Sequence, residues 1–173
     1  MRRAIFLDRD GVLIKIKKVN NKPYSVDEIN KIKILKETQK TLKKLKEKFL
    51  LIMVTNQPNV SRGLVSKSMV NKINLHIKNQ LNLDDIYCCF HDDHHKCKCR
   101  KPKAGMLIDA KKKWKIDLKR SFMVGDRKKD MLAGAKVNCN NLFIDYNYDE
   151  IKPRKNLCFY IKSIKDVIKY TYE

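Results

Sequence analysis

The chain has 173 residues, 43% of them hydrophobic, which is enough to bury one sizeable core, so we expect a single domain over residues 1–173. Its 40 lysines and arginines outnumber 19 acidic residues and give a formal net charge of +21, which attracts anions without naming the partner. The longest apolar run is shorter than a membrane span, and residues 1–3 lead into a strand instead of a signal peptide. We therefore expect a cytoplasmic protein with no membrane partner.

Strand-like and helix-like stretches alternate along the chain. Apolar runs bounded by polar residues predict strands, and apolar residues recurring every three or four positions predict helices. In chain order the predicted elements are a strand at 4–7, a helix at 35–49, a strand at 50–54, a helix at 66–81 with Ser66 as N-cap, a strand at 86–88, a helix at 105–114, a strand at 122–124, a helix at 131–136, strands at 142–144 and 158–161, and a closing helix from Ser163 onward. The alternation predicts an α/β fold with a parallel, doubly wound sheet, which binds ligands at the carboxyl ends of its strands.

Acidic residues follow two of these predicted strands. Asp8 and Asp10 come after the strand at 4–7, and Asp126 comes after the strand at 122–124. Aspartates also end strands and open turns without any catalytic role, and Asp10-Gly11 alone would be an ordinary turn signal. If folding brings the three carboxylates together, however, they form an oxygen-rich site that suits Mg²⁺.

Two further polar segments lie between the acidic ones, and four polar elements in this order make a chance arrangement unlikely. The strand at 50–54 ends in Thr55-Asn56-Gln57, and Arg100-Lys101-Pro102 precedes the second acidic segment. Thr55 and the backbone near Asn56 would hydrogen-bond the phosphoryl oxygens, and Lys101 would neutralise their charge.

The acidic residues would carry out the chemistry. Asp8 would attack phosphorus and form an aspartyl-phosphate. Asp10 would protonate the leaving group and then activate water. The predicted Mg²⁺ ligands are Asp8, Asp10 and Asp126, with Asp130 orienting its neighbours.

These four segments resemble the motifs of the haloacid dehalogenase superfamily of phosphatases. The match is residue by residue at five positions and covers roughly residues 4–145; the five are Asp8, Asp10, Thr55, Lys101 and Asp126. The resemblance implies a Rossmannoid three-layer sandwich with a mostly parallel sheet. About forty residues separate Asp10 from Thr55, which leaves no room for a large cap domain, so we expect specificity to come from loops at 15–24 and 59–63 and from the cysteine-rich segment.

Four of the six cysteines lie within twelve residues, and in a cytosolic chain this crowding indicates metal binding. One imidazole and three thiolates match a closed tetrahedral structural Zn²⁺ site. The predicted ligands, in a zinc loop at about 88–100, are Cys89, His91, Cys97 and Cys99. Three neighbouring side chains could replace one of these ligands, namely Cys88, His94 and His95.

Together with Thr55-Asn56-Gln57 and Ser61-Arg62-Gly63, the zinc motif is similar to the branch that contains D,D-heptose 1,7-bisphosphate phosphatases and histidinol-phosphate phosphatases. The sequence departs from that branch at Phe90 and Ala104, where prolines are usual. The resemblance implies removal of the 7-phosphate of a heptose bisphosphate, in nucleotide-heptose and lipopolysaccharide precursor synthesis. The substrate-binding residues we predict are Asn56, Gln57, Arg62, Arg100, Lys101 and Arg127.

The choice of substrate depends on charge near the site. A second phosphate on the substrate would be attracted by four basic residues, Lys15, Lys17, Lys18 and Arg100. The positively charged amine of histidinol phosphate would be repelled by the lysines. The five-residue interval inside the zinc loop resembles that of the histidinol-phosphate members, which favours the histidinol-phosphate alternative. A polynucleotide 3′-phosphatase and a zinc-stabilised nucleic-acid-binding module are the remaining alternatives, and the first lacks an aromatic stacking platform among the basic residues. We therefore expect a monomer that binds a small phosphorylated sugar and no nucleic acid.

Overall fold

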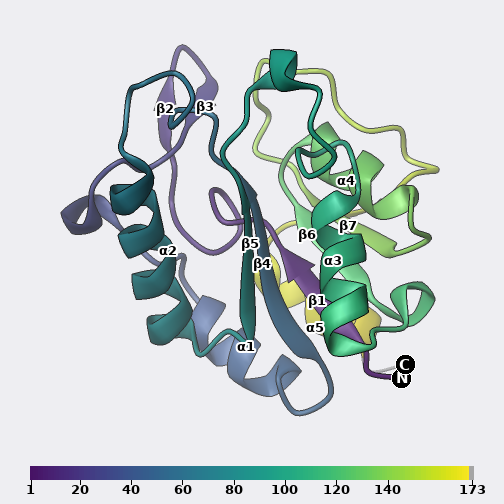
Figure 1. The fold of residues 1–173 in the computed structure, drawn as a ribbon. Coiled ribbons are helices and arrows are strands. Elements are labelled where there is room, and N and C mark those ends of the chain that lie inside the picture. Colours follow the sequence, from purple (N-terminus) through teal and green to yellow (C-terminus); the bar gives the residue numbers. More distant parts are fainter. Residues whose placement is uncertain (172–173) are drawn as a thin grey trace.

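A six-stranded, entirely parallel sheet forms the centre of the molecule in the computed structural model, which describes residues 1–171 (Figure 1). The strand order is β5-β4-β1-β6-β7-β8. The strands of this sheet are β1 (Ala4–Leu7), β4 (Leu50–Asn56), β5 (Asp85–Cys89), β6 (Phe122–Gly125), β7 (Asn140–Ile144) and β8 (Phe159–Ile161). The predicted parallel α/β fold is thus confirmed.

Strand β1 lies between β4 and β6, and all four of its residues are buried. Leu7 pairs with Met53 of β4 on one side and with Val124 of β6 on the other. Because the three strands are parallel and in this register, their carboxyl ends meet at one edge of the sheet. Three of the four predicted catalytic segments lie at the carboxyl ends of these strands, so the topology brings them together.

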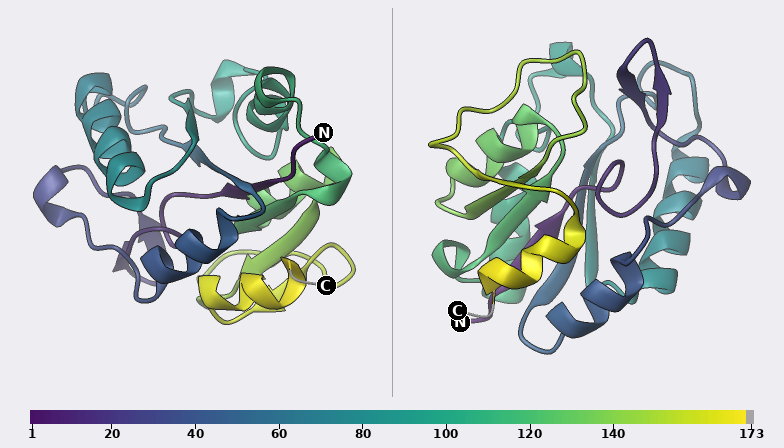
Figure 2. Two further views of the ribbon diagram at one scale, coloured as in Figure 1. Left: turned by 90° about the horizontal axis from the view of Figure 1, so that it is seen from below. Right: turned by 180° about the vertical axis from the view of Figure 1, so that it is seen from behind.

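Helices cover both faces of the sheet, so the molecule has three layers (Figure 2). The helices are α1 (Thr38–Leu45), α2 (Lys67–Leu81), α3 (Gly105–Trp114), α4 (Lys128–Ala135) and α5 (Val167–Thr171). Alternating residues of β1 divide the core: Ile5 and Leu7 pack with α1, α2 and α5, whereas Ala4 and Phe6 pack with α3 and α4. This two-sided burial explains why the strands are continuous apolar runs.

Most element boundaries agree with the sequence prediction, and α3 matches it residue for residue. Ser66 caps α2 as predicted, because its side chain accepts a hydrogen bond from Met69 N at 3.1 Å. Helix α1 is shorter than predicted: it starts after Glu37, whose φ is +67°, and ends before Phe49. Helix α4 starts three residues earlier than predicted, at Lys128. Any continuation of the closing helix to 172–173, the last residues of the predicted domain, lies outside the described residues.

The segment at 15–24, which we expected to be a loop, contains a two-stranded antiparallel hairpin formed by β2 (Lys17–Val19) and β3 (Lys22–Tyr24). Asn20 and Asn21 have φ of +48° and +55°, a pair of left-handed residues that asparagine tolerates and that a two-residue turn needs. The hairpin extends beyond the carboxyl edge of the sheet (Figure 1). Short 3₁₀ turns complete the described chain at Ile29–Lys31, Asp93–His95, Leu118–Arg120 and Ile164–Asp166.

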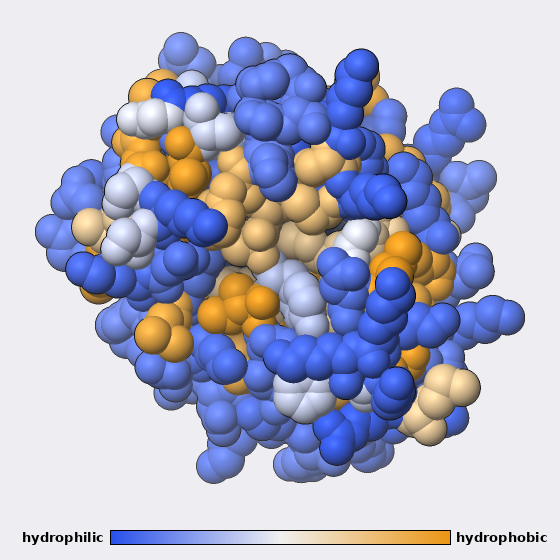
Figure 3. All heavy atoms as spheres, in the orientation of Figure 1, coloured by the Kyte–Doolittle hydropathy of each residue, from blue (hydrophilic) through white to orange (hydrophobic). Residues whose placement is uncertain are grey.

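The surface is mainly hydrophilic on the face drawn in Figure 3, with smaller apolar areas between the charged side chains. Across residues 1–171, no helix has the length and apolarity needed to cross a bilayer. The interval between β1 and β4 is filled by the hairpin, a 3₁₀ turn and α1, and the described residues form no separate cap there.

Candidate active site and zinc loop

Asp8 is the first acidic residue after β1. Its backbone N–H donates to Val124 O at 3.0 Å, which continues the β1–β6 pairing and fixes the residue beside β6. Its Oδ1 accepts a hydrogen bond from Arg9 N at 2.8 Å and lies 2.9 Å from Lys101 Nζ. The side chain is largely buried but lines a hollow above the strand ends, so a ligand there could reach it.

Lys101 is a buried lysine that is only 2% exposed. Its Nζ donates to Val54 O at 2.8 Å and forms an ion pair with Asp130 Oδ1 at 2.6 Å as well as with Asp8. Asn56 holds the main chain of Lys101 in place, because its Nδ2 donates to Lys101 O at 3.0 Å and its Oδ1 accepts from Lys101 N at 3.1 Å. The predicted phosphate-binding lysine is thus fixed next to the predicted nucleophile.

Three carboxylates gather around this ammonium group. Among residues 1–171, Asp8, Asp126 and Asp130 each offer an oxygen within 4.8 Å of the other two. Asp130, on the first turn of α4, also accepts from Arg127 N at 3.0 Å. One ammonium cannot balance three buried carboxylates, and Asp126 Oδ1 is buried without a hydrogen-bond partner. This oxygen-rich, electron-rich cluster fits a divalent cation such as Mg²⁺.

The pKa values in the cluster reflect the same excess of negative charge. Burial raises the pKa of Asp8 to about 6, although Lys101 opposes the shift. Burial and the neighbouring Asp8 raise the pKa of Asp126 well above its usual range. Burial alone would lower the pKa of Lys101, but Asp130 and Asp8 outweigh it and raise that pKa. The lysine therefore stays charged, while Asp8 and Asp126 hold protons more tightly than exposed carboxylates do.

Asp10 lies close to Asp8 in sequence, but its carboxylate is held by a different set of contacts. Arg9, which is fully buried, donates from Nε to Asp10 Oδ2 at 3.1 Å and from Nη2 to Asp10 Oδ1 at 3.2 Å. Gln57 Nε2 donates to Asp10 Oδ2 at 2.8 Å and to Thr55 Oγ1 at 2.9 Å. The structure thus joins Asp10, Thr55 and Gln57 in one hydrogen-bonded group, outside the three-carboxylate cluster.

The hollow above the strand ends exposes part of this machinery. Its walls come from the β1 turn, the hairpin, the end of β4 and the start of α4, and the lining residues are Asp8, Asp10, Ile16, Pro23, Tyr24, Ser25, Asn56, Lys101, Asp126, Arg127, Lys129 and Asp130. Arg127, predicted to bind substrate, is one of them, although its Nε also donates to Glu150 Oε2 at 2.9 Å. Lys129 was not predicted and adds a cation at the rim.

The zinc loop brings the four predicted ligands together. The Sγ atom of Cys89 lies 3.0 Å from that of Cys99 and 3.7 Å from that of Cys97, and His91 Nδ1 lies 3.4 Å from Cys99 Sγ. Sulfur and nitrogen atoms at these separations can share one tetrahedral ion. Within the described chain the cluster consists of these four residues.

The three alternative zinc ligands have other surroundings. The Asn74 side chain and the charge of Arg9 lie near Cys88, whose pKa burial raises to about 12. His95 Nδ1 accepts a hydrogen bond from Asp92 N at 3.1 Å, and the His94 ring lies 3.9 Å from that of His95. The contacts of these side chains therefore favour the predicted ligand set.

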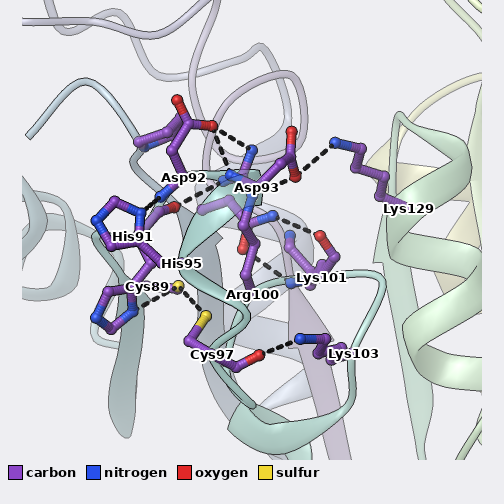
Figure 4. A network of polar contacts seen from close by, with 12 residues as sticks. Cys89, His91, Asp92, Asp93, His95, Cys97, Arg100, Lys101, Lys103 and Lys129 are labelled. Atoms are coloured by element: carbon purple, nitrogen blue, oxygen red, sulfur yellow. Dashed lines mark hydrogen bonds and ion pairs between the residues drawn. The ribbon is translucent and has the colours of Figure 1, made fainter. Parts of the chain in front are cut away.

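Arg100, predicted to bind substrate, is placed in the ion-pair network of the zinc loop (Figure 4). Arg62, also predicted to bind substrate, joins this network through Asp92. Asp92 accepts from Arg62 Nη2 at 3.0 Å and lies 3.6 Å from Arg100 Nη2. Asp93 accepts from Arg100 Nε at 2.7 Å. Both guanidinium groups are engaged by carboxylates of the loop, and neither arginine contributes to the lining of the hollow that the described residues form.

Besides Lys129, two residues near the chemistry were not identified from the sequence. Arg9 had a partial signal, because it stands between two acidic residues directly after a buried strand, and a charged side chain that is buried there needs such partners. Tyr148, whose hydroxyl donates to Asp126 Oδ2 at 2.7 Å, had none, because it lies in an irregular loop 22 residues further along the chain.

The fold and the site define a hydrolase-like α/β protein with a carboxylate cluster at the carboxyl edge of its sheet. The sequence matches the haloacid dehalogenase-like hydrolase family over residues 16–138, and the chain belongs to this family. A curated relative from Helicobacter pylori (strain J99), named D-glycero-beta-D-manno-heptose-1,7-bisphosphate 7-phosphatase, is 36% identical over 96% of this chain and 97% of its own. The relative from Campylobacter jejuni named as the corresponding alpha-heptose phosphatase is 31% identical over 99% of this chain and 96% of its own.

Solved structures agree with the fold. The crystal structure of D,D-heptose 1,7-bisphosphate phosphatase from B. bronchiseptica, complexed with magnesium and phosphate, superposes with a TM-score of 0.80. The alignment covers 99% of this chain and 98% of that one, at 22% identity. This similarity confirms the predicted three-layer architecture, and the curated relatives identify a phosphoric monoester hydrolase.

Proposed function

We propose that this chain is a Mg²⁺-dependent phosphatase that removes the 7-phosphate of D-glycero-D-manno-heptose 1,7-bisphosphate. The observation that carries the proposal is the cluster of Asp8, Asp126 and Asp130 around Lys101. This cluster lies beneath a hollow, and the hairpin forms one of the walls of that hollow. The names of the relatives supply the substrate, and the structure that is 22% identical was solved with magnesium and phosphate. The product would be a heptose 1-phosphate, as nucleotide-heptose synthesis requires.

The residues of this chain divide the reaction between them. Asp8 would attack phosphorus, breaking the bond to the sugar oxygen and forming an aspartyl-phosphate. Asp10 would give a proton to the leaving oxygen and take one from the water that hydrolyses the intermediate. Arg9 and Gln57 donate hydrogen bonds to both oxygens of Asp10, which leaves its carboxylate less available to a metal than those of the cluster, so we assign this side chain the acid–base role instead of the predicted metal role.

Charge neutralisation would come from Lys101 and from the metal. The carboxylates of Asp8 and Asp126 would hold Mg²⁺, and Asp130 would complete the cluster while keeping Lys101 in place. When bound, Mg²⁺ offsets the repulsion between the phosphate and the attacking carboxylate. Zn²⁺ would keep the loop that carries Arg100 and Lys101 folded, held by the four ligands Cys89, His91, Cys97 and Cys99.

Charge around the hollow supports a bisphosphate over histidinol phosphate. Arg127 and Lys129 line the hollow, and Lys17 and Lys18 lie on the hairpin beside it. These cations would attract a second phosphate and repel an amine. The relatives carry names for both the alpha and the beta sugar, so the proposal covers the heptose bisphosphate in either anomeric form.

A phosphate-release assay with and without Mg²⁺ tests the proposal. We expect hydrolysis of heptose 1,7-bisphosphate to exceed that of histidinol phosphate and of a 3′-phosphorylated oligonucleotide, and to stop when Mg²⁺ is chelated. Asp8→Asn should abolish turnover and leave the circular dichroism spectrum unchanged, whereas Asp109→Asn, at an exposed position of α3, should retain full activity. Preference for either of the other substrates, or turnover by Asp8→Asn, would refute the proposal.

A further inference from the structure

The loop that follows β7 reaches back over the carboxylate cluster and places a tyrosine against it. Tyr148 is 8% exposed, and its hydroxyl donates to Asp126 Oδ2 at 2.7 Å. The other oxygen, Asp126 Oδ1, is buried and has no hydrogen-bond partner. The tyrosine therefore occupies one oxygen of this carboxylate and leaves the other available to a cation.

The backbone on the opposite side limits how Asp126 can turn. A Cβ atom added to Gly11 would lie 2.0 Å from Asp126 Oδ2, so this oxygen sits tightly against the β1 turn. Oδ2 is thus confined by the Gly11 backbone and by the Tyr148 hydroxyl together. Rotation of the carboxylate would break the hydrogen bond or collide with the turn, so the direction of Oδ1 is set by these two contacts.

Tyr148 is in turn held by the β2–β3 hairpin. Lys18 Nζ donates to Tyr146 O at 3.1 Å and lies 5.1 Å from the centre of the Tyr148 ring, within the range of a cation–π contact. Asn21 Nδ2 donates to Asn147 O at 2.7 Å, and the backbone of Asn21 accepts from Asp149 N at 3.2 Å. The hairpin and the tyrosine loop therefore form one packed unit.

The same hairpin lines the proposed substrate hollow through Pro23 and Tyr24. Strand β3 of the hairpin thus lines the hollow, and Asn21 in its turn contacts the loop that carries Tyr148. A change in the hairpin would therefore reach the Asp126 carboxylate through Lys18 and Tyr148.

We propose that Tyr148 is a positioning residue that orients Asp126 for Mg²⁺, and that the hairpin, through Lys18, holds Tyr148 in place. The proposal rests on the proposed function only in taking Asp126 as a Mg²⁺ ligand. Hydrogen bonds to ligating carboxylates commonly change metal affinity by about 10–100-fold when they are removed. The hairpin would thus contribute to metal binding as well as to substrate selection.

Isothermal titration with Mg²⁺ alone, without substrate, tests the positioning role directly. Tyr148→Phe keeps the ring and removes the hydroxyl, and we expect its Mg²⁺ Kd to rise about 10–100-fold. Turnover should recover to within a few-fold of the parent at saturating Mg²⁺. The matched control is Tyr160→Phe, which removes a hydroxyl that donates to Pro153 O at 2.8 Å, on the edge strand β8, and should leave the Kd unchanged.

A folded Tyr148→Phe protein with the Mg²⁺ Kd of the parent would overturn the proposal. If that variant fails to fold, Lys18→Met provides the test, because Lys18 is exposed and its replacement leaves the hydroxyl in place. Its Kd should rise about two- to tenfold, and an unchanged Kd would overturn the proposal as well.

If the proposed phosphatase function is wrong, Mg²⁺ titration and phosphate release together give a different pattern of results from the one expected if only the role of Tyr148 is wrong. A parent protein that binds Mg²⁺ but releases no phosphate would refute the proposed phosphatase activity. The role of Tyr148 would still be supported in that case if the Mg²⁺ Kd of the Tyr148→Phe variant is higher than that of the parent. A parent protein that binds no Mg²⁺ would refute both.

Discussion

Replacing Lys101 by Met would remove the single ammonium from a cluster of three buried carboxylates. Lys101 Nζ lies 2.9 Å from Asp8 and 2.6 Å from Asp130, and the side chain is 2% exposed. Methionine has nearly the same length and fills the space, so packing changes little and the main effect is the loss of charge compensation.

Removing one partner of a buried ion pair costs about 3–5 kcal/mol of unfolding free energy. We expect this loss at pH 8 without Mg²⁺. The pKa of Asp8 in the parent is about 6, above the ordinary value of 3.8, and Lys101 holds it down, so it rises further in the variant. Protonation of a group with a raised folded pKa stabilises the folded state as the pH falls. Parent and variant both gain in this way, and the variant gains more, so the deficit should shrink towards pH 5 by about 1.4 kcal/mol for each unit by which its Asp8 pKa exceeds that of the parent.

Urea unfolding of the parent and of Lys101→Met at pH 8 and pH 5, in the presence of EDTA, measures both quantities. Lys113→Met is the matched control, because its side chain is 61% exposed and its ion pair with Asp85 at 2.9 Å is worth at most about 1 kcal/mol. A deficit for Lys101→Met below about 1 kcal/mol at pH 8, or one that does not change with pH, would refute the electrostatic account of the cluster.

Three further predictions concern the metals. Gly11→Ala should weaken Mg²⁺ binding at least about tenfold in titration calorimetry, because the added Cβ would lie 2.0 Å from Asp126 Oδ2. The Mg²⁺ affinity of the parent should fall at least about tenfold from pH 8 to pH 5, since the metal must then displace the proton from Asp8, whose pKa is about 6, and burial also raises the pKa of Asp126. Cys99→Ser should reduce zinc, measured by elemental analysis, from about one ion per chain to near zero, together with a lower Tm.

Matched variants separate these effects on metal binding from an unspecific loss of stability. Gly63→Ala also forces a side chain into positive φ, at +70°, but meets no atom within 4 Å, so its Mg²⁺ affinity should equal that of the parent. Cys139→Ser removes a buried thiol outside the cluster and should retain zinc. Equal Mg²⁺ binding by the two alanine variants, zinc retention by Cys99→Ser, or a pH-independent Mg²⁺ affinity would each contradict the corresponding prediction.

The fold could be predicted because buried parallel strands leave a direct signal in the sequence. The runs at 4–7 and 50–54 are apolar throughout, since helices cover both faces of the sheet. The hairpin at 17–24 left a weaker signal, because its strands are short, lysine-rich and largely exposed, and only the paired Asn20-Asn21 marks the turn.

The candidate site could be predicted as far as it depends on topology. Asp8 and Asp126 follow neighbouring strands, so parallel pairing alone brings them together. The partners of individual side chains could not be predicted in this way. The engagement of Arg100 by Asp92 and Asp93, and the approach of Tyr148 to Asp126, depend on the paths of irregular loops that no periodicity specifies.

The proposed reaction depends on phosphorylation of Asp8 during turnover. Acid quenching of the protein with heptose 1,7-bisphosphate and Mg²⁺, followed by peptide mass spectrometry, measures this directly. We predict one phosphoryl group on the peptide that contains Asp8, and none on the corresponding peptide of the Asp8→Asn variant. A phosphoryl group found on another residue of the parent during turnover, or undiminished phosphate release by the Asp8→Asn variant, would contradict the assignment of Asp8 as the nucleophile.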